Sequence, residues 1–212
     1  MNTEKNLSSR LAQYCDAAVK GFDQISERRK LPLDALAQYI LSSIQAGGSI
    51  DLTFICTHNS RRSHMAQLWA LAAVAYYGID NVQSYSGGTE ATAFNKSAIK
   101  AMEGAGFQIT KTQDGSNPVF EVMLSQNSKS HKMWSKKYDD PLNPSKNFAA
   151  VMVCSDADQN CSFVPGATRI AMPFDDPKAF DGTPSEFDKY AERCLQIATE
   201  ILYVMNQVKN AQ

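Results

Sequence analysis

Residues 50–77 read IDLTFICTHNSRRSHMAQLWALAAVAYY, and their pattern indicates the fold class. The run IDLTFI contains one charged residue, Asp51, and predicts a short buried strand. Residues from about 63 to 77 predict a helix, so that a strand, a loop and a helix follow one another directly. This succession is the repeating unit of α/β proteins.

The same alternation continues toward the C-terminus. Strands are predicted at residues 82–86, 148–153 and 167–172, and helices at residues 96–105 and 184–208. Strands that alternate with helices favour a parallel sheet covered by helices on both faces. We therefore predict an α/β fold with a doubly wound parallel sheet.

Residues 1–49 predict an N-terminal helical extension. Apolar residues recur at intervals of three and four in two runs, residues 7–22 and 36–44, which predicts two amphipathic helices. The charged residues 27–30 interrupt the pattern, so the second helix is expected to begin near Pro32, because proline suits a first helical turn. The pair is too small for a core of its own, and we expect it to pack on the main domain or on another subunit.

The main domain is predicted to comprise residues 50–212, with an inserted segment at about 111–147. The alternation of strands and helices does not explain this insertion. Within it, residues 119–124 and 131–137 can form a hairpin joined by the polar turn QNSKS.

The composition excludes several classes of protein. Among 212 residues, 21 Lys and Arg balance 22 Asp and Glu, and the net charge of −1 gives no overall attraction for nucleic acid or an anionic membrane. The apolar stretch 68–79 is shorter than the roughly 20 residues that span a bilayer. The polar start MNTEKNLSSR lacks the apolar core of a signal peptide. We expect a cytoplasmic protein whose five cysteines are mostly reduced thiols.

The segment CTHNSRRS, residues 56–63, carries the chemistry, and we call it the oxyanion loop. A loop between a strand and a helix can point successive N–H groups inward, and the helix N-terminus adds positive potential. Such a site suits a tetrahedral oxyanion and stabilises a thiolate, the nucleophilic form of cysteine. A planar guanidinium can hold two oxyanion oxygens. The predicted oxyanion-binding residues are Cys56, Thr57, His58, Asn59, Ser60, Arg61, Arg62 and Ser63.

Individual side chains of the oxyanion loop have expected roles. Arg62 is expected to clamp the anion, and Ser63 to donate a hydrogen bond to the Cys56 sulfur. Asn59 can fix the loop backbone, and Arg61 adds positive charge at the mouth of the pocket.

The stretch FICTHNSRRSHMAQ resembles the phosphate loop of the low-molecular-weight protein tyrosine phosphatase superfamily, which includes the thioredoxin-coupled arsenate reductases. The resemblance continues through SYSGGTEATAFNKSAIKAM, VMVCSDADQNC and MPFDDP, and leaves residues 1–49 unmatched. It implies a four-stranded parallel sheet in the order 2-1-3-4. It also implies that residues 50–212 form the catalytic domain of a cysteine-dependent enzyme acting on arsenate or a phosphate-like oxyanion.

The resemblance also assigns roles outside the oxyanion loop. Asp176, which precedes Pro177, matches the general acid of the superfamily. Cys154 and Cys161 match the cysteine pair of thioredoxin-coupled arsenate reductases. In that mechanism Cys56 attacks arsenate, Cys154 attacks Cys56 and releases arsenite, and Cys161 takes over the disulfide, which thioredoxin reduces. The electrons come from thiols, so no bound cofactor is expected. No metal is expected either, because a zinc site at Cys154 and Cys161 would need two more ligands.

Two other functions remain open. A low-molecular-weight phosphatase acting on a phosphoprotein or a small phosphoester would need only Cys56, Arg62 and Asp176. The resemblance argues against a phosphotyrosine specialist, because Lys178-Ala179-Phe180 stands where classical members carry tyrosines. A module that only binds an oxyanion is the third reading, and a complete set of cysteine, arginine and aspartate is more than binding requires.

Overall fold

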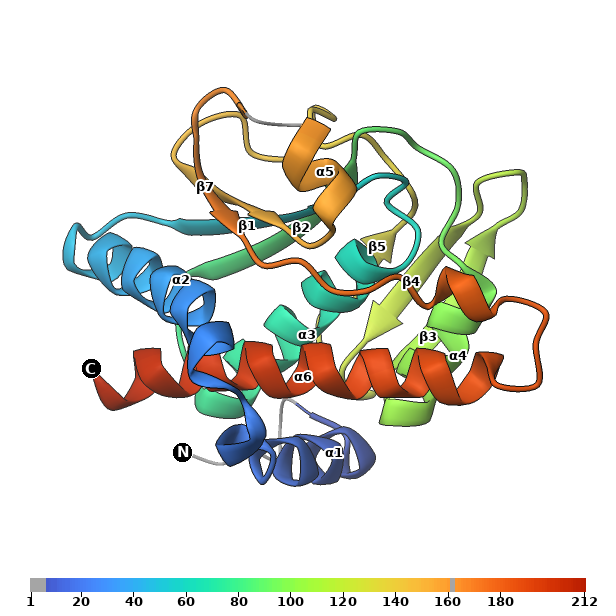
Figure 1. Ribbon diagram of the computed structural model, residues 1–212, viewed down its shortest axis with the longest axis horizontal. Helices are drawn as coiled ribbons and strands as arrows, with labels where there is room; N and C mark the ends of the chain where they lie inside the picture. Colours follow the sequence, from blue (N-terminus) through green and yellow to red (C-terminus); the bar gives the residue numbers. More distant parts are fainter. Residues whose placement is uncertain (1–6, 161–162) are drawn as a thin grey trace.

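The central sheet has the predicted architecture. A computed structural model describes residues 7–160 and 163–212. Its main sheet consists of four parallel strands, in the spatial order β2-β1-β6-β7 (Figure 1). The strands are β1 (Ile50–Cys56), β2 (Val82–Gly88), β6 (Phe148–Met152) and β7 (Ala167–Ala171). Counted along the chain among the parallel strands, this is the order 2-1-3-4, as predicted.

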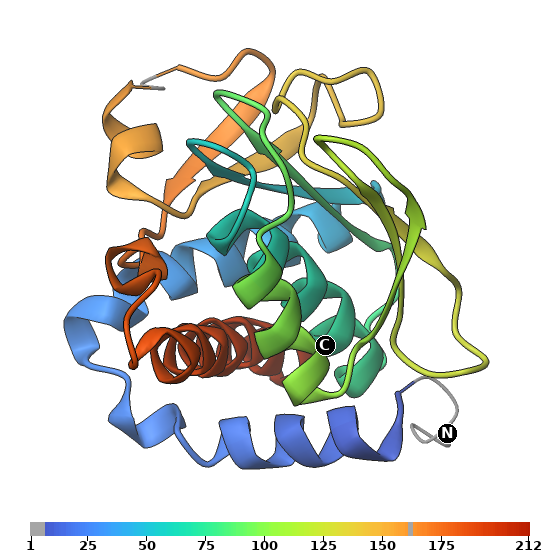
Figure 2. The ribbon, with the colours of Figure 1, turned by 90° about the vertical axis from the view of Figure 1, so that its right-hand side faces the viewer.

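Helices cover both faces of this sheet. Viewed in Figures 1 and 2, α3 and α6 lie on one side of the sheet and the short α5 lies on the other. The chain order of strands and helices therefore produces a doubly wound α/β fold, and the predicted helix bounds are correct to within about two residues. The helices of the main domain are α3 (Arg62–Tyr77), α4 (Lys96–Ala105), α5 (Ser155–Asn160) and α6 (Glu186–Asn210).

The N-terminal extension packs on the rest of the chain. It contains α1 (Ser9–Val19), a 3-10 turn η2 (Phe22–Gln24) and α2 (Glu27–Gln45). Both helices lie against α6, and their apolar residues belong to the same continuous core as the sheet. The fully buried side chains of the extension include Leu11, Cys15, Leu33, Leu36 and Ile40.

The prediction that the second helix begins near Pro32 is wrong. Helix α2 starts at Glu27, because Ser26 caps it and accepts a hydrogen bond from the Arg29 N–H at 3.3 Å. Pro32 therefore lies inside the helix. The charged residues 27–30 form its first turn, in which Lys30 pairs with Glu27 at 2.7 Å.

The inserted segment forms a second, antiparallel sheet. Its strands are β3 (Gln108–Gln113), β4 (Val119–Met123) and β5 (His131–Met133), in the order β3-β4-β5. The predicted hairpin is present as β4 and β5, although β5 ends before Lys137. Strand β3 was not predicted, because its sequence QITKTQ is polar and four of its six residues are exposed.

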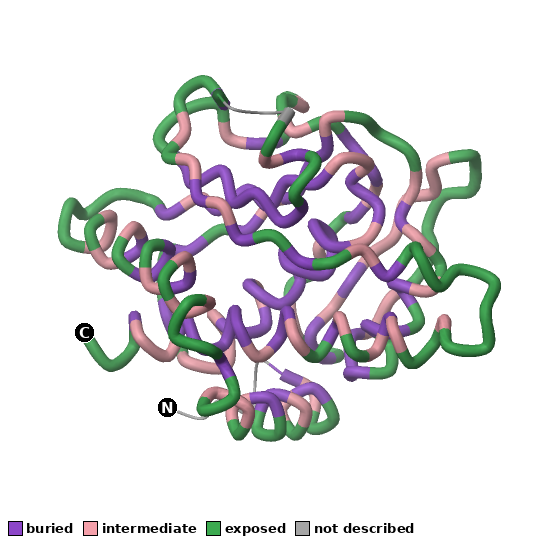
Figure 3. Tube along the Cα trace, in the orientation of Figure 1, coloured by how far each residue is buried: buried purple, intermediate pink, exposed green. Residues whose placement is uncertain are grey.

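Burial is greatest where the central strands meet α3 and α6 (Figure 3). His64 lies in this interior, in the first turn of α3, and is completely buried. Its ring stacks on Phe94 at a centroid distance of 4.2 Å. Burial, with the nearby charge of Lys136 as a second cause, lowers the pKa of His64 from 6.5 to about 3.

In the parts of the chain that the structure describes, no helix combines the length and the hydrophobicity needed to cross a bilayer.

The neutral state of His64 predicts a specific sensitivity to acid. Between pH 6.5 and about 3, the unfolded chain protonates His64 and the folded chain does not, so the free energy of unfolding falls as the pH falls. Replacement by Gln removes this contribution. We expect the wild-type stability to fall relative to His64→Gln by roughly 1.4 kcal/mol per pH unit below the unfolded-state pKa. Urea unfolding at several pH values measures this difference, and a difference that does not change with pH would contradict it.

Candidate active site

The oxyanion loop joins the last residue of β1, Cys56, to the first residue of α3, Arg62. Asn59 adopts a left-handed conformation with φ of 42°, which turns the chain back toward the helix. Among the described residues, no acceptor is found for the backbone N–H groups of residues 58–61. These donors at the start of a helix are available for an anion.

The end of β2 fixes the path of this loop. The N–H groups of Thr89 and Glu90 donate to the carbonyl oxygens of Cys56 and Thr57, at 3.2 and 2.8 Å. The backbones approach so closely that a Cβ atom at Gly88 would lie 2.7 Å from the Asn59 nitrogen. Glycine is therefore required at position 88 if the oxyanion loop is to keep this shape.

The Cys56 sulfur is held by a short chain of hydrogen bonds. It lies 3.1 Å from Ser63 Oγ, which accepts a hydrogen bond from Asn59 Nδ2 at 2.9 Å. Because Asn59 donates to this hydroxyl, the Ser63 proton is free to point at the sulfur and to stabilise a thiolate. Ser63 thus lies within hydrogen-bond distance of the Cys56 sulfur, as its expected role requires, whereas Asn59 contacts the Ser63 side chain and not the backbone of the loop.

The inserted segment clamps the other side of the loop. Ser135 Oγ donates to the His58 carbonyl oxygen at 2.9 Å, and the Lys136 N–H donates to Asn59 Oδ1 at 2.8 Å. Burial lowers the pKa of Lys136 to about 8. No sequence pattern indicates these two residues, because each lies 77 positions from the loop residue that it contacts.

Arg62 lies between the oxyanion loop and residues 173–181, which we call the acid segment. Its Nη1 donates to the Phe174 carbonyl oxygen at 2.8 Å, and its Nη2 donates to Asp176 Oδ2 at 2.6 Å. Arg62 Nε is buried and has no partner among the described residues. This N–H is therefore available to an oxyanion, whereas an oxyanion that uses Nη2 must displace the Asp176 carboxylate.

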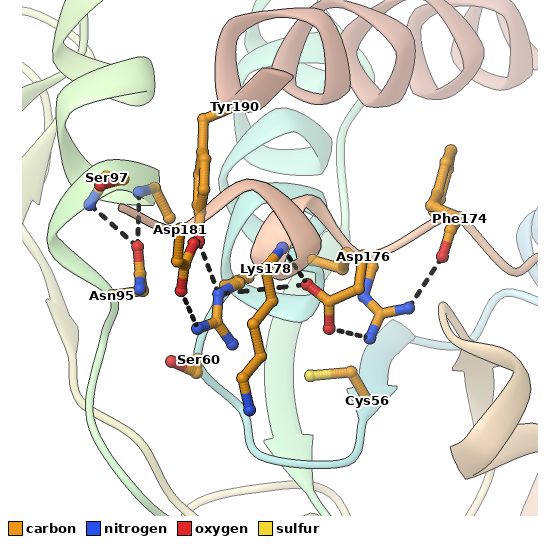
Figure 4. A network of polar contacts seen from close by, with 12 residues as sticks. Cys56, Ser60, Asn95, Ser97, Phe174, Asp176, Lys178, Asp181 and Tyr190 are labelled. Carbon is orange, nitrogen blue, oxygen red and sulfur yellow. Dashed lines mark hydrogen bonds and ion pairs between the residues drawn. The ribbon is translucent and has the colours of Figure 1, made fainter. Parts of the chain in front are cut away.

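Asp176 lies over the oxyanion loop. Figure 4 shows it near Cys56, with Phe174 at the other side of the same view. It caps the 3-10 turn η3 (Pro177–Phe180), and its Oδ1 accepts a hydrogen bond from the Lys178 N–H at 3.0 Å. Its carboxylate is about a third exposed, so a proton can reach it from solvent.

Arg61 lies near Asp176, with its Nε 4.0 Å from Asp176 Oδ1, and its guanidinium is paired within the protein. Its Nε donates to the Tyr190 hydroxyl at 2.7 Å and its Nη2 donates to Asp181 Oδ2 at 3.1 Å. Tyr190 in turn donates to Asp181 Oδ1 at 2.7 Å. The Arg61 charge is thus used to fasten the acid segment to α6, a role that sequence reasoning missed.

The other polar loop side chains face outward or contact the protein itself. Ser60 Oγ donates to the Ala93 carbonyl oxygen at 2.7 Å. His58 Nε2 lies 3.7 Å from Glu90 Oε2, at the edge of the loop. These two side chains shape the loop, and their contribution to an anion site would come through the backbone.

Cys154 lies beside the oxyanion loop. Strands β1 and β6 are neighbours with Ile55 opposite Met152, so the residues that follow each strand stay close. Cys154 Sγ lies 3.6 Å from Thr57 Oγ1, next to Cys56 in the chain, and is completely buried. Cys161 lies outside the described residues. Within the described residues, no cluster of three His, Cys, Asp or Glu side chains could hold a metal ion.

The sequence is similar to those of known proteins. Residues 51–126 match the family described as low molecular weight phosphotyrosine protein phosphatase. "Arsenate reductase 2" of Staphylococcus epidermidis RP62A is 35% identical over 138 residues, which cover 64% of this chain and 83% of the relative. "Arsenate reductase" of Staphylococcus aureus Newman is 34% identical over 149 residues, which cover 69% of this chain and 91% of the relative.

A solved structure shares the fold. The low molecular weight phosphotyrosine phosphatase of Vibrio cholerae O395 superposes with a TM-score of 0.51 and covers 74% of this chain and 94% of its own. The two sequences are 14% identical, so this similarity concerns the fold alone.

The close approach at Gly88 predicts the effect of a single methyl group. In Gly88→Ala the new Cβ would lie 2.3 Å from the Glu90 carbonyl oxygen, so the backbone beside the oxyanion loop must shift. We expect a loss of about 1–3 kcal/mol in stability, as for other overpacked sites, together with weaker binding of inorganic phosphate.

Gly104→Ala is the matched control. Gly104 lies in α4, where no atom of another described element is within 4 Å of the added Cβ. The substitution should increase stability by about 0.5–1 kcal/mol and leave phosphate binding unchanged. Thermal unfolding and calorimetric titration with phosphate test both variants. Normal phosphate binding in Gly88→Ala would show that the loop does not depend on this contact.

Proposed function

Because the chain belongs to the low molecular weight phosphotyrosine protein phosphatase family, whose members include relatives named arsenate reductase, we propose that it reduces arsenate to arsenite through the thiols of Cys56, Cys154 and Cys161. It is a cysteine-dependent enzyme that acts on an oxyanion, of the reductase or the phosphatase kind. The position of Cys154 favours the reductase over the phosphatase. A second thiol 3.6 Å from the hydroxyl of Thr57 serves a disulfide relay and has no use in phosphoester hydrolysis.

The first step uses the oxyanion loop. The Cys56 thiolate attacks arsenic(V), and one arsenate oxygen leaves as water, which gives a thiol–arsenate adduct. The free N–H groups of the loop and Arg62 Nε hold the remaining oxygens. Ser63 stabilises the Cys56 thiolate before the attack. Asp176 first breaks its hydrogen bond with Arg62 and then protonates the departing oxygen.

The second step transfers the electrons. The Cys154 thiolate attacks the Cys56 sulfur, a Cys56–Cys154 disulfide forms, and the sulfur–arsenic bond breaks with its electron pair left on arsenic. Arsenic(V) becomes arsenic(III), and two thiols are oxidised. The Cys161 thiolate then attacks Cys154, which frees Cys56 and leaves a Cys154–Cys161 disulfide. A dithiol protein of the thioredoxin class reduces this bond, and we expect the cycle to run in the reducing cytoplasm.

The alternative is hydrolysis of a phosphoester on a protein or a small molecule. The same three residues, Cys56, Arg62 and Asp176, suffice for a phosphocysteine intermediate and its hydrolysis. The contact between Arg62 and Asp176 at 2.6 Å is compatible with both reactions, so the two functions differ only in the use of Cys154 and Cys161.

The cysteine relay predicts a defined set of disulfides. One turnover with arsenate, without a reductant, should leave a Cys154–Cys161 disulfide. Cys161→Ser should instead trap Cys56–Cys154, because nothing resolves it. Cys154→Ser should stop after the adduct and release no arsenite. Cys15→Ala, in a buried cysteine of α1, serves as the matched control and should behave like the wild type. Peptide mass spectrometry under non-reducing conditions measures each product.

The same experiment can contradict the reductase function. If the thiols of Cys154 and Cys161 stay free after treatment with arsenate, and an aryl phosphate is hydrolysed rapidly, the phosphatase function replaces the proposed one.

The proposed role of Asp176 as general acid predicts that Asp176 and its neighbour Asp175 differ in their effect on the rate of hydrolysis. Asp176→Asn should lower aryl phosphate hydrolysis by roughly 10²–10⁴-fold, because a general acid for the leaving oxygen is lost. Asp175, whose side chain is almost fully exposed, is the matched control, and Asp175→Asn should change the rate little. Steady-state kinetics of both variants test this assignment, and an unchanged rate in Asp176→Asn would refute it.

A further inference from the structure

Arg29, in the first turn of α2, brings the N-terminal extension to the edge of the active site. Its Nε donates to Glu200 Oε2 at 2.9 Å, and its Nη2 lies 2.7 Å from the same oxygen. Glu200 belongs to α6 and is nearly completely buried. Its second oxygen accepts a hydrogen bond from Gln196 at 3.0 Å, so the carboxylate that holds Arg29 is itself fixed.

The guanidinium of Arg29 also lies over the ring of Phe174, 4.6 Å from its centroid. A guanidinium over an aromatic face is attracted to it, most strongly when both are withdrawn from water. Phe174 is buried, and it belongs to the acid segment. The ring is thus held by a residue of the N-terminal extension.

Phe174 connects this contact to Arg62. The Phe174 N–H donates to the Val153 carbonyl oxygen at 3.1 Å, and its own carbonyl oxygen accepts the hydrogen bond from Arg62 Nη1 at 2.8 Å. That hydrogen bond fixes the rotation of the Arg62 guanidinium. The rotation decides where the unpaired Nε points.

We infer that Arg29 is a positioning residue for the oxyanion clamp. Through the ring of Phe174 it fixes the carbonyl group that orients Arg62, so that Nε is presented to the anion. Glu200 compensates the charge of Arg29, so the effect on Arg62 is one of geometry and not of added positive potential. The inference rests on the proposed role of Arg62 in binding the oxyanion, and it gives residues 1–49 a part in the active site.

The competing explanation is that the Arg29–Glu200 pair only fastens α2 to α6. In that case its loss lowers stability and leaves the anion site of the folded protein unchanged. Phosphate affinity, measured well below the unfolding temperature, separates the two explanations.

The test uses full-length protein with Cys56→Ser, so that inorganic phosphate binds without reaction. Arg29→Ala in this background should weaken phosphate binding on the order of tenfold, which lies between the values typical of an exposed and of a desolvated cation–π contact. Arg29→Lys keeps the charge and loses the planar stack, and should bind phosphate with intermediate affinity. Arg28→Ala, at the exposed neighbouring position in α2, is the matched control and should bind like the parent.

A double-mutant cycle tests whether Arg29 acts through Arg62. Once Arg62→Lys has removed the guanidinium, Arg29→Ala should cost no further affinity for phosphate, whereas its effect on the unfolding temperature should persist. Full phosphate affinity in Arg29→Ala, or an equal loss with and without Arg62→Lys, would overturn the inference. If Arg29→Ala does not fold, Arg29→Lys in the same cycle decides by the same criteria.

The result is independent of arsenate chemistry. Failure of the wild type to reduce arsenate, with phosphate binding that depends on Arg29, would reject the proposed reduction and support this inference. Normal arsenate reduction with phosphate binding that does not depend on Arg29 would support the proposed reduction and reject the role of Arg29.

Discussion

The backbone of Gly88 occupies the space beside the oxyanion loop, and the shape of the site depends on this contact. No side chain fits there, because a Cβ would approach Asn59 and Thr57 to 2.7 Å. Gly88 also connects the central sheet to the inserted segment, since its N–H donates to the Lys136 carbonyl oxygen at 2.9 Å and its carbonyl oxygen accepts a hydrogen bond from the Tyr138 N–H at 2.9 Å. The loop is therefore confined by β2 on one side and by the inserted segment on the other. A preorganised loop of this kind can present its N–H groups without a reorganisation cost during the reaction.

The two consecutive arginines of the loop have separate roles because the chain turns between them. Arg62 begins α3 and faces the acid segment and the buried interior, where its Nε remains unpaired among the described residues. Arg61 faces Asp181 and Tyr190 and carries the far end of the acid segment. The segment is thus held at Phe174 and Asp176 by one arginine and at Asp181 by the other. Asp176 lies between Phe174 and Asp181 in this segment, where a small rearrangement lets an incoming anion replace its carboxylate on Arg62.

Local sequence patterns predicted the features that depend on neighbouring residues in the chain, such as most helices and strands. The apolar run before Cys56 and the helix after it define a strand–loop–helix unit, so the loop and the cysteine could be located from the sequence alone. The strand order followed from the resemblance to a known superfamily. Strand β3 could not be found, because a polar edge strand carries no hydrophobic alternation. The start of α2 was misplaced because Pro32 was given more weight than the capping residue Ser26.

Long-range contacts account for what the sequence did not predict at the site. Ser135 and Lys136 contact the loop across 77 residues, and Arg29 pairs with Glu200 across 171 residues. Single-sequence patterns hold no information on such pairs, because each residue type is ordinary at its own position. The pairing of Arg61 with Tyr190 could not be predicted for the same reason, since Tyr190 lies 129 residues away.

Every step proposed for the active site requires Cys56 to be the nucleophile at the bottom of an oxyanion site. Alkylation of Cys56 by iodoacetamide can be followed by peptide mass spectrometry with and without arsenate or phosphate. We expect Cys56 to be alkylated in the free protein and either oxyanion to slow its alkylation in a saturable manner, whereas alkylation of Cys15 and Cys194 should not change. Alkylation of Cys56 at the same rate with and without both oxyanions would show that Cys56 does not lie at the oxyanion site.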